Sequence, residues 1–262
     1  MGVFRITMKN KTKVKFHCPI QQYGFAEFEG DNLEELTKLY NQLAETKLNF
    51  FKGKFVEVKT FTNEVVRYND LTHTYTDLEG NVLLSGSQFS KSIKPSFDKA
   101  KLLPMVAKKY KVSEAHIDAM WTANSKISLT FGNAIHYAME QWFKHKDHST
   151  EKDYHLPKHP FLKEVVTSFP DKDKLILPEV VVSDIKNKMV GRVDGLMKDL
   201  TPIDYKSDAD IKKNLKYHFM QLSFYATILI NHGHKVDKVI VWNYTDKWTK
   251  YESEVLKINL NI

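Results

Sequence analysis

Three strand-like apolar runs lie between two helical segments, and this order constrains the fold more than any other feature of the chain. The runs cover residues 175–183, 187–197 and 201–207. The flanking segments, 126–146 and 211–231, carry apolar side chains at helical spacing. Another apolar run, KVIVWNY, follows the second helix. Helices that alternate with strands in this way predict an α/β domain.

Charged residues interrupt two of these runs. Asp194 lies in VGRVDGLM, and Asp204 and Lys206 lie in PIDYK. Aspartate is a poor strand former, and a buried charge is costly unless it is paired or binds a metal ion. These residues therefore either face solvent or form a site.

The composition is that of a folded domain with a basic surface. The 262 residues are enough for one domain and a small appendage, and 42% hydrophobic residues supply a core. A net charge of +7 favours a polyanionic partner, which is nucleic acid or a membrane surface. The single cysteine, Cys18, excludes an internal disulfide and a cysteine-ligated iron–sulfur cluster, and it favours a reducing, cytoplasmic compartment. No apolar run reaches membrane-spanning length and no signal-peptide core is visible, so we expect no membrane association.

The first 62 residues predict a small α+β subdomain. Alternating apolar side chains predict strands at residues 3–9, 14–18 and 24–29. Asp31 then has the character of a helix N-cap, with Glu34 as its capping-box partner. We place the domain boundary after residue 62 and assign residues 63–262 to the main domain.

The segment that opens the main domain combines a hairpin with a basic stretch. Residues 65–86 predict a hairpin that turns at DLEGN, although Asp77, Glu79 and Asn81 in that turn could instead form a metal-binding loop. Residues 87–112 hold seven lysines and one acid and are expected to be partly helical. This stretch is either a solvated face or an arm that contacts phosphates.

The spacing of the interrupting charges indicates a hard-oxygen metal site. Asp204 and Lys206 point the same way, because side chains alternate along a strand. A carboxylate there can bind a divalent ion, and an ammonium can neutralise charge on a phosphoryl oxygen. Asp194 would add a second carboxylate, a combination suited to Mg²⁺ or Mn²⁺. The alternatives are a surface ion pair on an edge strand for Asp204 and Lys206, and a turn for Asp194 and Gly195.

Five further polar residues, in three segments of the chain, accompany these charges. His136 and Glu140 lie one turn apart on one helix, and Gln221 and Tyr225 have the same spacing on the other. Glu179 interrupts the strand-like run LILPEVVVS. Each has an ordinary alternative, which is a side-chain contact, a polar helix flank or an edge residue.

Together these motifs resemble the RecB-like branch of the PD-(D/E)XK nuclease superfamily. The order is G-x-x-x-H-x-x-x-E, a strand glutamate, G-x-x-D, I-D-Y-K and Q-x-x-x-Y, over about residues 132–225. The resemblance implies a restriction-endonuclease-like αβββαβ core. Many members have threonine after the lysine, where this chain keeps a hydroxyl with Ser207. Members with an iron–sulfur cluster need four cysteines, so the chain resembles cluster-free phage exonucleases of the lambda exonuclease type.

The resemblance implies a role for each matching position. The metal ligands would be His136, Asp194, Asp204 and the carbonyl of Tyr205. The catalytic group would be Lys206 with Asp204, Asp194 and Glu140, supported by Glu179. The contacts with DNA would come from Gln221, Tyr225 and Ser207, joined by Lys94, Lys99 and Lys101 of the basic stretch.

The expected function is that of a metal-dependent DNA exonuclease, which hydrolyses phosphodiester bonds with Mg²⁺, or with Mn²⁺ in its place. It would serve DNA recombination, repair or replication in the cytoplasm of a bacterium or a phage-infected cell. The expected partners are DNA and a recombination or single-strand-binding protein. The alternatives are a structure-specific, flap-type endonuclease and a non-catalytic DNA-binding module on a nuclease fold.

Overall fold

The structure is a computed structural model that describes residues 12–17, 25–30, 55–145 and 157–259. The chain forms two compact units, Met1–Phe55 with Asn69–His73, and Val56–Tyr68 with Thr74–Ile262. In the first unit, β1 (Thr12–His17) and β2 (Phe25–Gly30) pair antiparallel. Two of the strands predicted near the N-terminus are therefore confirmed. The strand predicted at 3–9 and the helix predicted after Asp31 lie outside the described residues.

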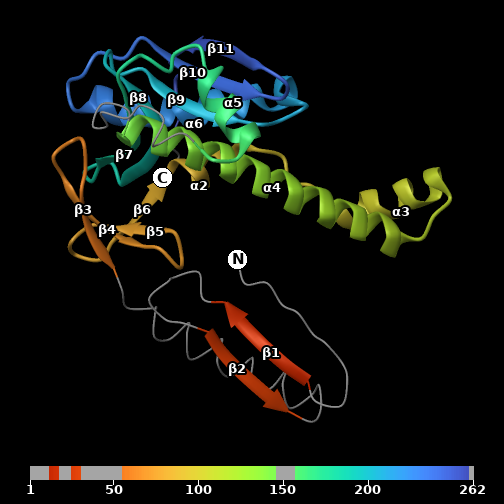
Figure 1. Ribbon diagram of the computed structural model, residues 1–262. Helices are drawn as coiled ribbons and strands as arrows, with labels where there is room; N and C mark the ends of the chain where they lie inside the picture. The colour runs from red at the N-terminus through yellow and green to blue at the C-terminus, as the bar shows by residue number, and fades with distance from the viewer. Residues whose placement is uncertain (1–11, 18–24, 31–54, 146–156, 260–262) are drawn as a thin grey trace. The chain divides into compact units, whose positions relative to one another are not determined.

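A nine-stranded sheet organises the second unit (Figure 1). Its strand order is β11-β10-β9-β8-β6-β5-β4-β3, and β7 pairs with β8 outside this path. The strands are β3 (Val56–Lys59), β4 (Val65–Asn69), β5 (Thr74–Thr76), β6 (Val82–Ser85), β7 (Ile176–Asp184), β8 (Met189–Met197), β9 (Pro202–Lys206), β10 (Lys238–Tyr244) and β11 (Trp248–Glu254). The expected α/β class is confirmed.

The predicted hairpin at 65–86 is wrong in one respect, because it contains three strands rather than two. The side chain of Asn69 accepts hydrogen bonds from the backbone of Leu71 and Thr72, at 3.0 and 3.1 Å, and these bonds close an additional turn. The turn predicted at DLEGN is confirmed. There the Asp77 carboxylate accepts from the backbone and side-chain nitrogens of Asn81, at 2.7 and 2.8 Å. That carboxylate therefore closes a turn, which is the plainer of the two interpretations.

Five helices in the described part of the chain accompany the sheet. They are α2 (Gly86–Ile93), α3 (Lys99–Tyr110), α4 (Glu114–His145), α5 (Pro160–Thr167) and α6 (Ile211–Asn231). The order predicted between 126 and 244 is the observed order, with the short helix α5 added between α4 and β7. Helix α4, however, begins twelve residues earlier than predicted. None of the described helices is long and apolar enough to cross a membrane.

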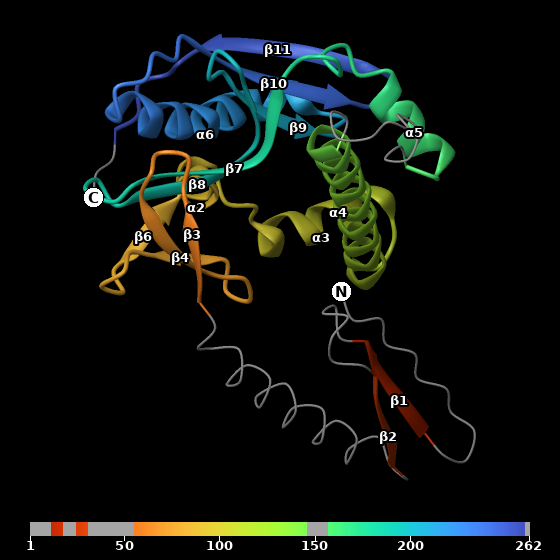
Figure 2. The same ribbon diagram turned by 60° about the vertical axis from the view of Figure 1, so that its left-hand side comes forward.

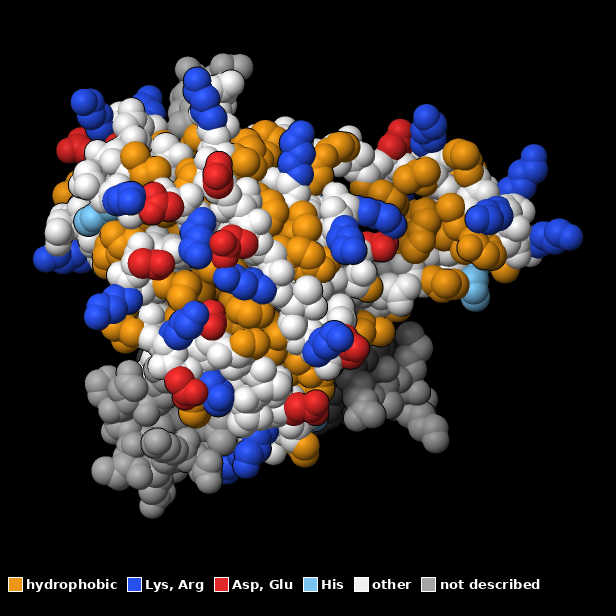
Figure 3. Space-filling model, turned by 90° about the horizontal axis from the view of Figure 1, so that it is seen from above, with side chains coloured by type: hydrophobic (Ala, Val, Ile, Leu, Met, Phe, Trp, Pro, Cys, Tyr) orange, Lys and Arg blue, Asp and Glu red, His pale blue; other side chains and the backbone are white. Residues whose placement is uncertain are grey.

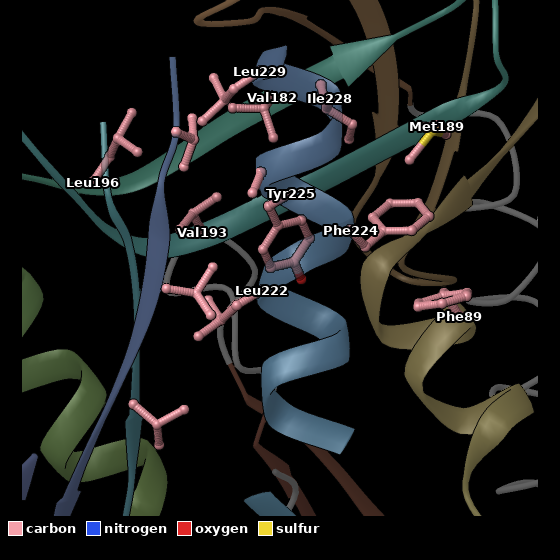
Figure 4. Packing of buried hydrophobic residues seen from close by; sticks show 14 of the residues in the cluster. Phe89, Val182, Met189, Val193, Leu196, Leu222, Phe224, Tyr225, Ile228 and Leu229 are labelled. Atoms are coloured by element: carbon pink, nitrogen blue, oxygen red, sulfur yellow. The ribbon is translucent and has the colours of Figure 1, made fainter. Parts of the chain in front are cut away.

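The two faces of the sheet build separate cores. Along β10, Val239 and Val241 face α6, while Ile240 and Trp242 face the opposite side, because side chains alternate along a strand. In Figure 4, apolar side chains of α6 lie between that helix and strands β7 and β8. The other core joins residues of α4 and α5 to an aromatic cluster made of Phe169, Tyr205, Trp242, Tyr244 and Trp248.

Helix α3 and the first half of α4 form a helical hairpin that extends from the sheet (Figures 1 and 2). Ala107 of α3 and Ile117 of α4 are buried in it. The other buried residues of α4 lie after residue 134, where the helix reaches the sheet. We call residues 97–130 the arm.

Candidate functional site

Asp204 and Lys206 lie in the interior of the sheet. Strand β9 has β8 on one side and β10 on the other, so it is not an edge strand. Asp204 is only 6% exposed. The Lys206 Nζ lies 2.5 Å from Asp204 Oδ1 and also donates to the carbonyl of Tyr205 at 3.2 Å. The alternative of a surface ion pair on an edge strand is therefore wrong.

Asp194 reaches the same place from β8. The antiparallel register pairs Gly195 with Ile203 and Leu196 with Pro202, so the next step brings Asp194 opposite Asp204. At that step the backbone N–H of Tyr205 donates to Asp194 Oδ2, at 3.0 Å. Asp194 and Gly195 both lie inside β8, so the turn interpretation is wrong.

Glu179 occupies the matching level of β7. Strands β7 and β8 pair on either side of Glu179 and Asp194, but the ladder skips these two residues. Glu179 has φ of 53°, and it is the one described non-glycine residue with positive φ inside a strand. Such a backbone costs on the order of 1–3 kcal/mol and persists where the surroundings enforce it. Three neighbouring strands therefore each place a carboxylate at one level of the sheet.

Helix α4 supplies His136 and Glu140. The His136 Nδ1 lies 3.3 Å from Asp194 Oδ2, so the histidine joins the paired aspartates. Glu140 instead forms an ion pair with Lys144, one turn further along α4. Glu179 pairs with Arg192 at 2.9 Å, yet burial, with Glu140 nearby, raises the pKa of its carboxyl. In this arrangement Glu140 accompanies Glu179 rather than the two aspartates.

The pKa values of the two aspartates shift in opposite directions. Burial, together with the nearby charge of Asp204, raises the pKa of Asp194 to about 7, although His136 opposes this shift. Burial also opposes ionisation of Asp204, but the Lys206 ammonium outweighs it and lowers the pKa of Asp204. The pKa of Lys206 is raised, because the two carboxylates outweigh its own burial. At neutral pH the site thus combines an ionised Asp204 with a protonated lysine.

His218 of α6 belongs to this cluster and was missed from the sequence. Its Nδ1 lies 3.8 Å from Asp204 Oδ2, and its side chain is largely buried. Burial lowers the pKa of the imidazole. One signal was present, since His218 lies three residues before Gln221 and therefore on the same helix face. The sequence does not show that this face turns toward Asp204.

Gln221 and Tyr225 form the contact that their spacing predicts. The Gln221 side chain donates to the Tyr225 hydroxyl at 3.0 Å. Tyr225 is 5% exposed and packs against the backbone of β8, where a Cβ on Gly191 would lie 2.1 Å from its ring. Gly191 is therefore required for this packing. Tyr225 has little surface to offer a ligand, and it holds Gln221 in place.

The remaining predicted contacts with DNA fall into two groups. Lys94 caps α2 and lies over the ring of Tyr217, next to His218, and Ser207 lies against α4 at Gly132. Both are close to the paired aspartates. Lys99 and Lys101 begin α3, in the arm, where Lys99 pairs with Asp118 of α4 at 2.5 Å.

The donor atoms of the site suit a hard divalent cation. Asp204 Oδ2 is buried and has no hydrogen-bond partner, which costs on the order of 1–3 kcal/mol for a polar group. A cation would compensate it, and carboxylate, carbonyl and imidazole donors are within reach. In the described ranges, no three histidine, cysteine or acidic side chains are gathered as a finished coordination sphere. The metal roles of His136, Asp194, Asp204 and Tyr205 stay predictions that these donors fit.

Comparisons with known proteins assign neither a family nor a function to this chain. No protein-family model matches the chain, and no curated protein matches it in sequence. The chain is similar to a solved structure described as the crystal structure of SSO0001, with 16% sequence identity and a TM-score of 0.36. The match covers 84% of this chain and 79% of that one. A likeness this weak supports no conclusion about fold or function.

Proposed function

We propose that this chain is a Mg²⁺-dependent deoxyribonuclease, built on a restriction-endonuclease-like core of the RecB-like PD-(D/E)XK type, and that it acts as an exonuclease. The observation that carries the proposal is the convergence of Asp194, Asp204 and Lys206 around a buried carboxylate oxygen that lacks a partner. A stabilising role alone would favour fully paired charges there.

The arrangement of the flanking elements supports the same proposal. Apart from the short helix α5 that follows α4, the element order α4-β7-β8-β9-α6-β10 is the order that the resemblance implies. His136 of α4 contacts Asp194 of β8, and Gln221 of α6 donates to Tyr225, whose ring packs against β8. A fortuitous D-x-K triplet would not gather these other residues of the motif.

The side chains of this chain have definable roles in phosphodiester hydrolysis. Mg²⁺ held at Asp204 and Asp194 would polarise the phosphoryl oxygen and lower the pKa of the attacking water. Lys206 is held protonated by the carboxylates, so its ammonium stabilises the charge that develops on the phosphoryl oxygen. The same raised pKa makes Lys206 a poor general base. Asp204 fixes the ammonium position through their 2.5 Å contact.

The test compares end-labelled linear duplex DNA with a covalently closed circle, in Mg²⁺ or EDTA, for wild type and for Lys206→Ala. The matched control is Lys213→Ala, whose ammonium is exposed on the first turn of α6. We expect Mg²⁺-dependent loss of the linear DNA alone. Lys206→Ala should lower the rate by about 10²–10³-fold, as removal of a transition-state charge partner does, and the control should keep the wild-type rate.

Each other result assigns a different function. Cutting of the circle would replace the exonuclease with an endonuclease, for which a flap substrate is the next probe. If neither DNA is cut in Mg²⁺ or Mn²⁺ while the protein still binds DNA, the chain is a binding module on a nuclease fold.

A further inference from the structure

The middle of α4 buries none of its residues against the described part of the chain. Every residue from 122 to 130 is exposed, over more than two turns of helix, and Ile127 and Leu129 are 67% and 51% exposed. A globular helix normally buries one apolar stripe. This stretch is TANSKISLT, and threonine, serine, asparagine and isoleucine are weak helix formers. Neither packing nor intrinsic propensity accounts for a helix here, so a ligand that covers it is expected.

The charge of this stretch favours a polyanion as that ligand. Helix α4 has no acidic residue between Asp118 and Glu140. Its exposed polar side chains are of the types that contact phosphates in nucleic-acid complexes. They are Thr122, Asn124, Ser125, Lys126, Ser128 and Thr130.

The arm adds positive charge and a pair of aromatic rings. Residues 94–126 contain seven lysines and three acids, and Lys99 is the one of these lysines that forms an ion pair with a described acid. Phe97 is 64% exposed and meets Trp121 edge to face, with ring centroids 5.4 Å apart. Both rings line a hollow of about 400 Å³ together with Lys99 and Lys126. In Figure 3 lysine and hydrophobic side chains gather at the end of the arm.

The near end of α4 leads into the candidate site. Gly132 lies beside Ser207, which directly follows Lys206, and His136 contacts Asp194. At 1.5 Å per residue, Trp121 lies roughly 22 Å along the helix from His136. A stacked strand that advances about 3.4 Å per nucleotide would cover that distance with roughly six or seven nucleotides.

We propose that the exposed face of α4, together with α3, binds single-stranded DNA and leads it to the site. The inference rests on the proposed function and adds the form of the substrate. Unpaired bases have free faces that stack on aromatic rings such as Phe97, whereas a duplex offers only its backbone and grooves. The hydroxyl and amide side chains of α4 contact the phosphates between the aromatic pair and the site.

The test measures equilibrium binding of labelled oligothymidylates in EDTA, where nothing is cleaved. Ser125 and Ser128 lie on one helix face, so the variant is Ser125→Glu with Ser128→Glu, and the control is Ser125→Gln with Ser128→Gln. Both replacements are better helix formers than serine, so neither weakens the fold. On a 15-mer we expect at least tenfold weaker binding for the Glu variant and less than a twofold change for the control. Phe97→Ala should also weaken binding by about tenfold, the loss of one stacked base.

Three results would overturn the inference. They are equal binding of the 15-mer by the Glu and Gln variants, a Glu effect confined to duplex DNA, and a Glu effect confined to self-association of the protein. Failure of the proposed function is seen separately, because a protein that binds the 15-mer through α4 without hydrolysing DNA keeps the binding inference and loses the nuclease. If the Glu variant hydrolyses DNA at the wild-type rate, the nuclease proposal is kept and the binding inference is lost.

Discussion

Folded proteins normally bury apolar side chains and expose charged ones. The two halves of helix α4 break this rule in opposite ways. The inner half packs on the sheet and brings His136 to aspartates that are mostly buried, so charge lies inside the protein. The outer half exposes Ile127 and Leu129, so apolar surface lies outside. Both departures cost free energy in the isolated chain. The two proposals account for both departures, with a cation at the inner half and a nucleic-acid strand at the outer half.

The largest expected difference between the halves comes from one truncation made at two positions. Ile135 is fully buried in the inner half and Ile127 is 67% exposed in the outer half. Ile135→Ala should lower the free energy of unfolding by about 2–5 kcal/mol, through lost burial and the cavity left behind. Ile127→Ala should change it by less than about 0.5 kcal/mol, because alanine is the better helix former at an exposed position. Urea unfolding of both variants checks this, and equal losses would break the comparison.

The buried charge of the inner half should appear as pH dependence. The folded pKa of Asp194 is about 7, above its ordinary value of 3.8, so the folded state binds more protons between these values and loses stability as the pH rises through them. Between pH 5 and 8 the contribution is on the order of 2–3 kcal/mol. Urea unfolding in EDTA should show that Asp194→Asn removes this part of the pH dependence. Parallel pH profiles for the variant and wild type would contradict the assigned burial of charge.

The smallest expected effect concerns two glycines that flank the site. A Cβ on Gly191 would overlap the Tyr225 ring, so Gly191→Ala should lower the free energy of unfolding by about 1–3 kcal/mol. A Cβ on Gly132 of α4 would only touch Ser207 at 3.4 Å, so Gly132→Ala should be neutral or stabilising. Thermal unfolding of both variants measures the difference. A neutral Gly191→Ala would show that Tyr225 has room to move and is not fixed as described.

Hydrophobic periodicity predicted the packed elements well and missed the exposed one. The stripe that includes Ile135 and Met139 located the inner half of α4, because those side chains pack on the sheet. The outer half has no such stripe, since its residues from 122 to 130 are all exposed, and the predicted helix therefore began too late. Hydrophobic periodicity reflects the burial of one face of a helix, so it cannot predict a helix that buries no face.

The sequence likewise predicted one part of the candidate site and missed another part. Alternation along β9 predicted that Asp204 and Lys206 share a side, and they are in contact. The strand register that places Glu179 and Asp194 at one level depends on tertiary pairing, as does the approach of His218 from α6. The positive φ of Glu179 has no sequence signal, because glutamate rarely adopts it and the surrounding strands impose it.

The most direct test of the metal site is thermal unfolding of wild type and Asp204→Asn with increasing Mg²⁺. An ion that binds only the folded state adds about 2.7 kcal/mol of stability at a hundredfold excess over its Kd. We predict that Mg²⁺ raises the Tm of the wild-type protein and leaves that of Asp204→Asn unchanged, because the carboxylate with the unpaired buried oxygen is the ligand that is lost. An unchanged wild-type Tm at saturating Mg²⁺, or an equal rise in both proteins, would contradict the metal site and the nuclease proposal that depends on it.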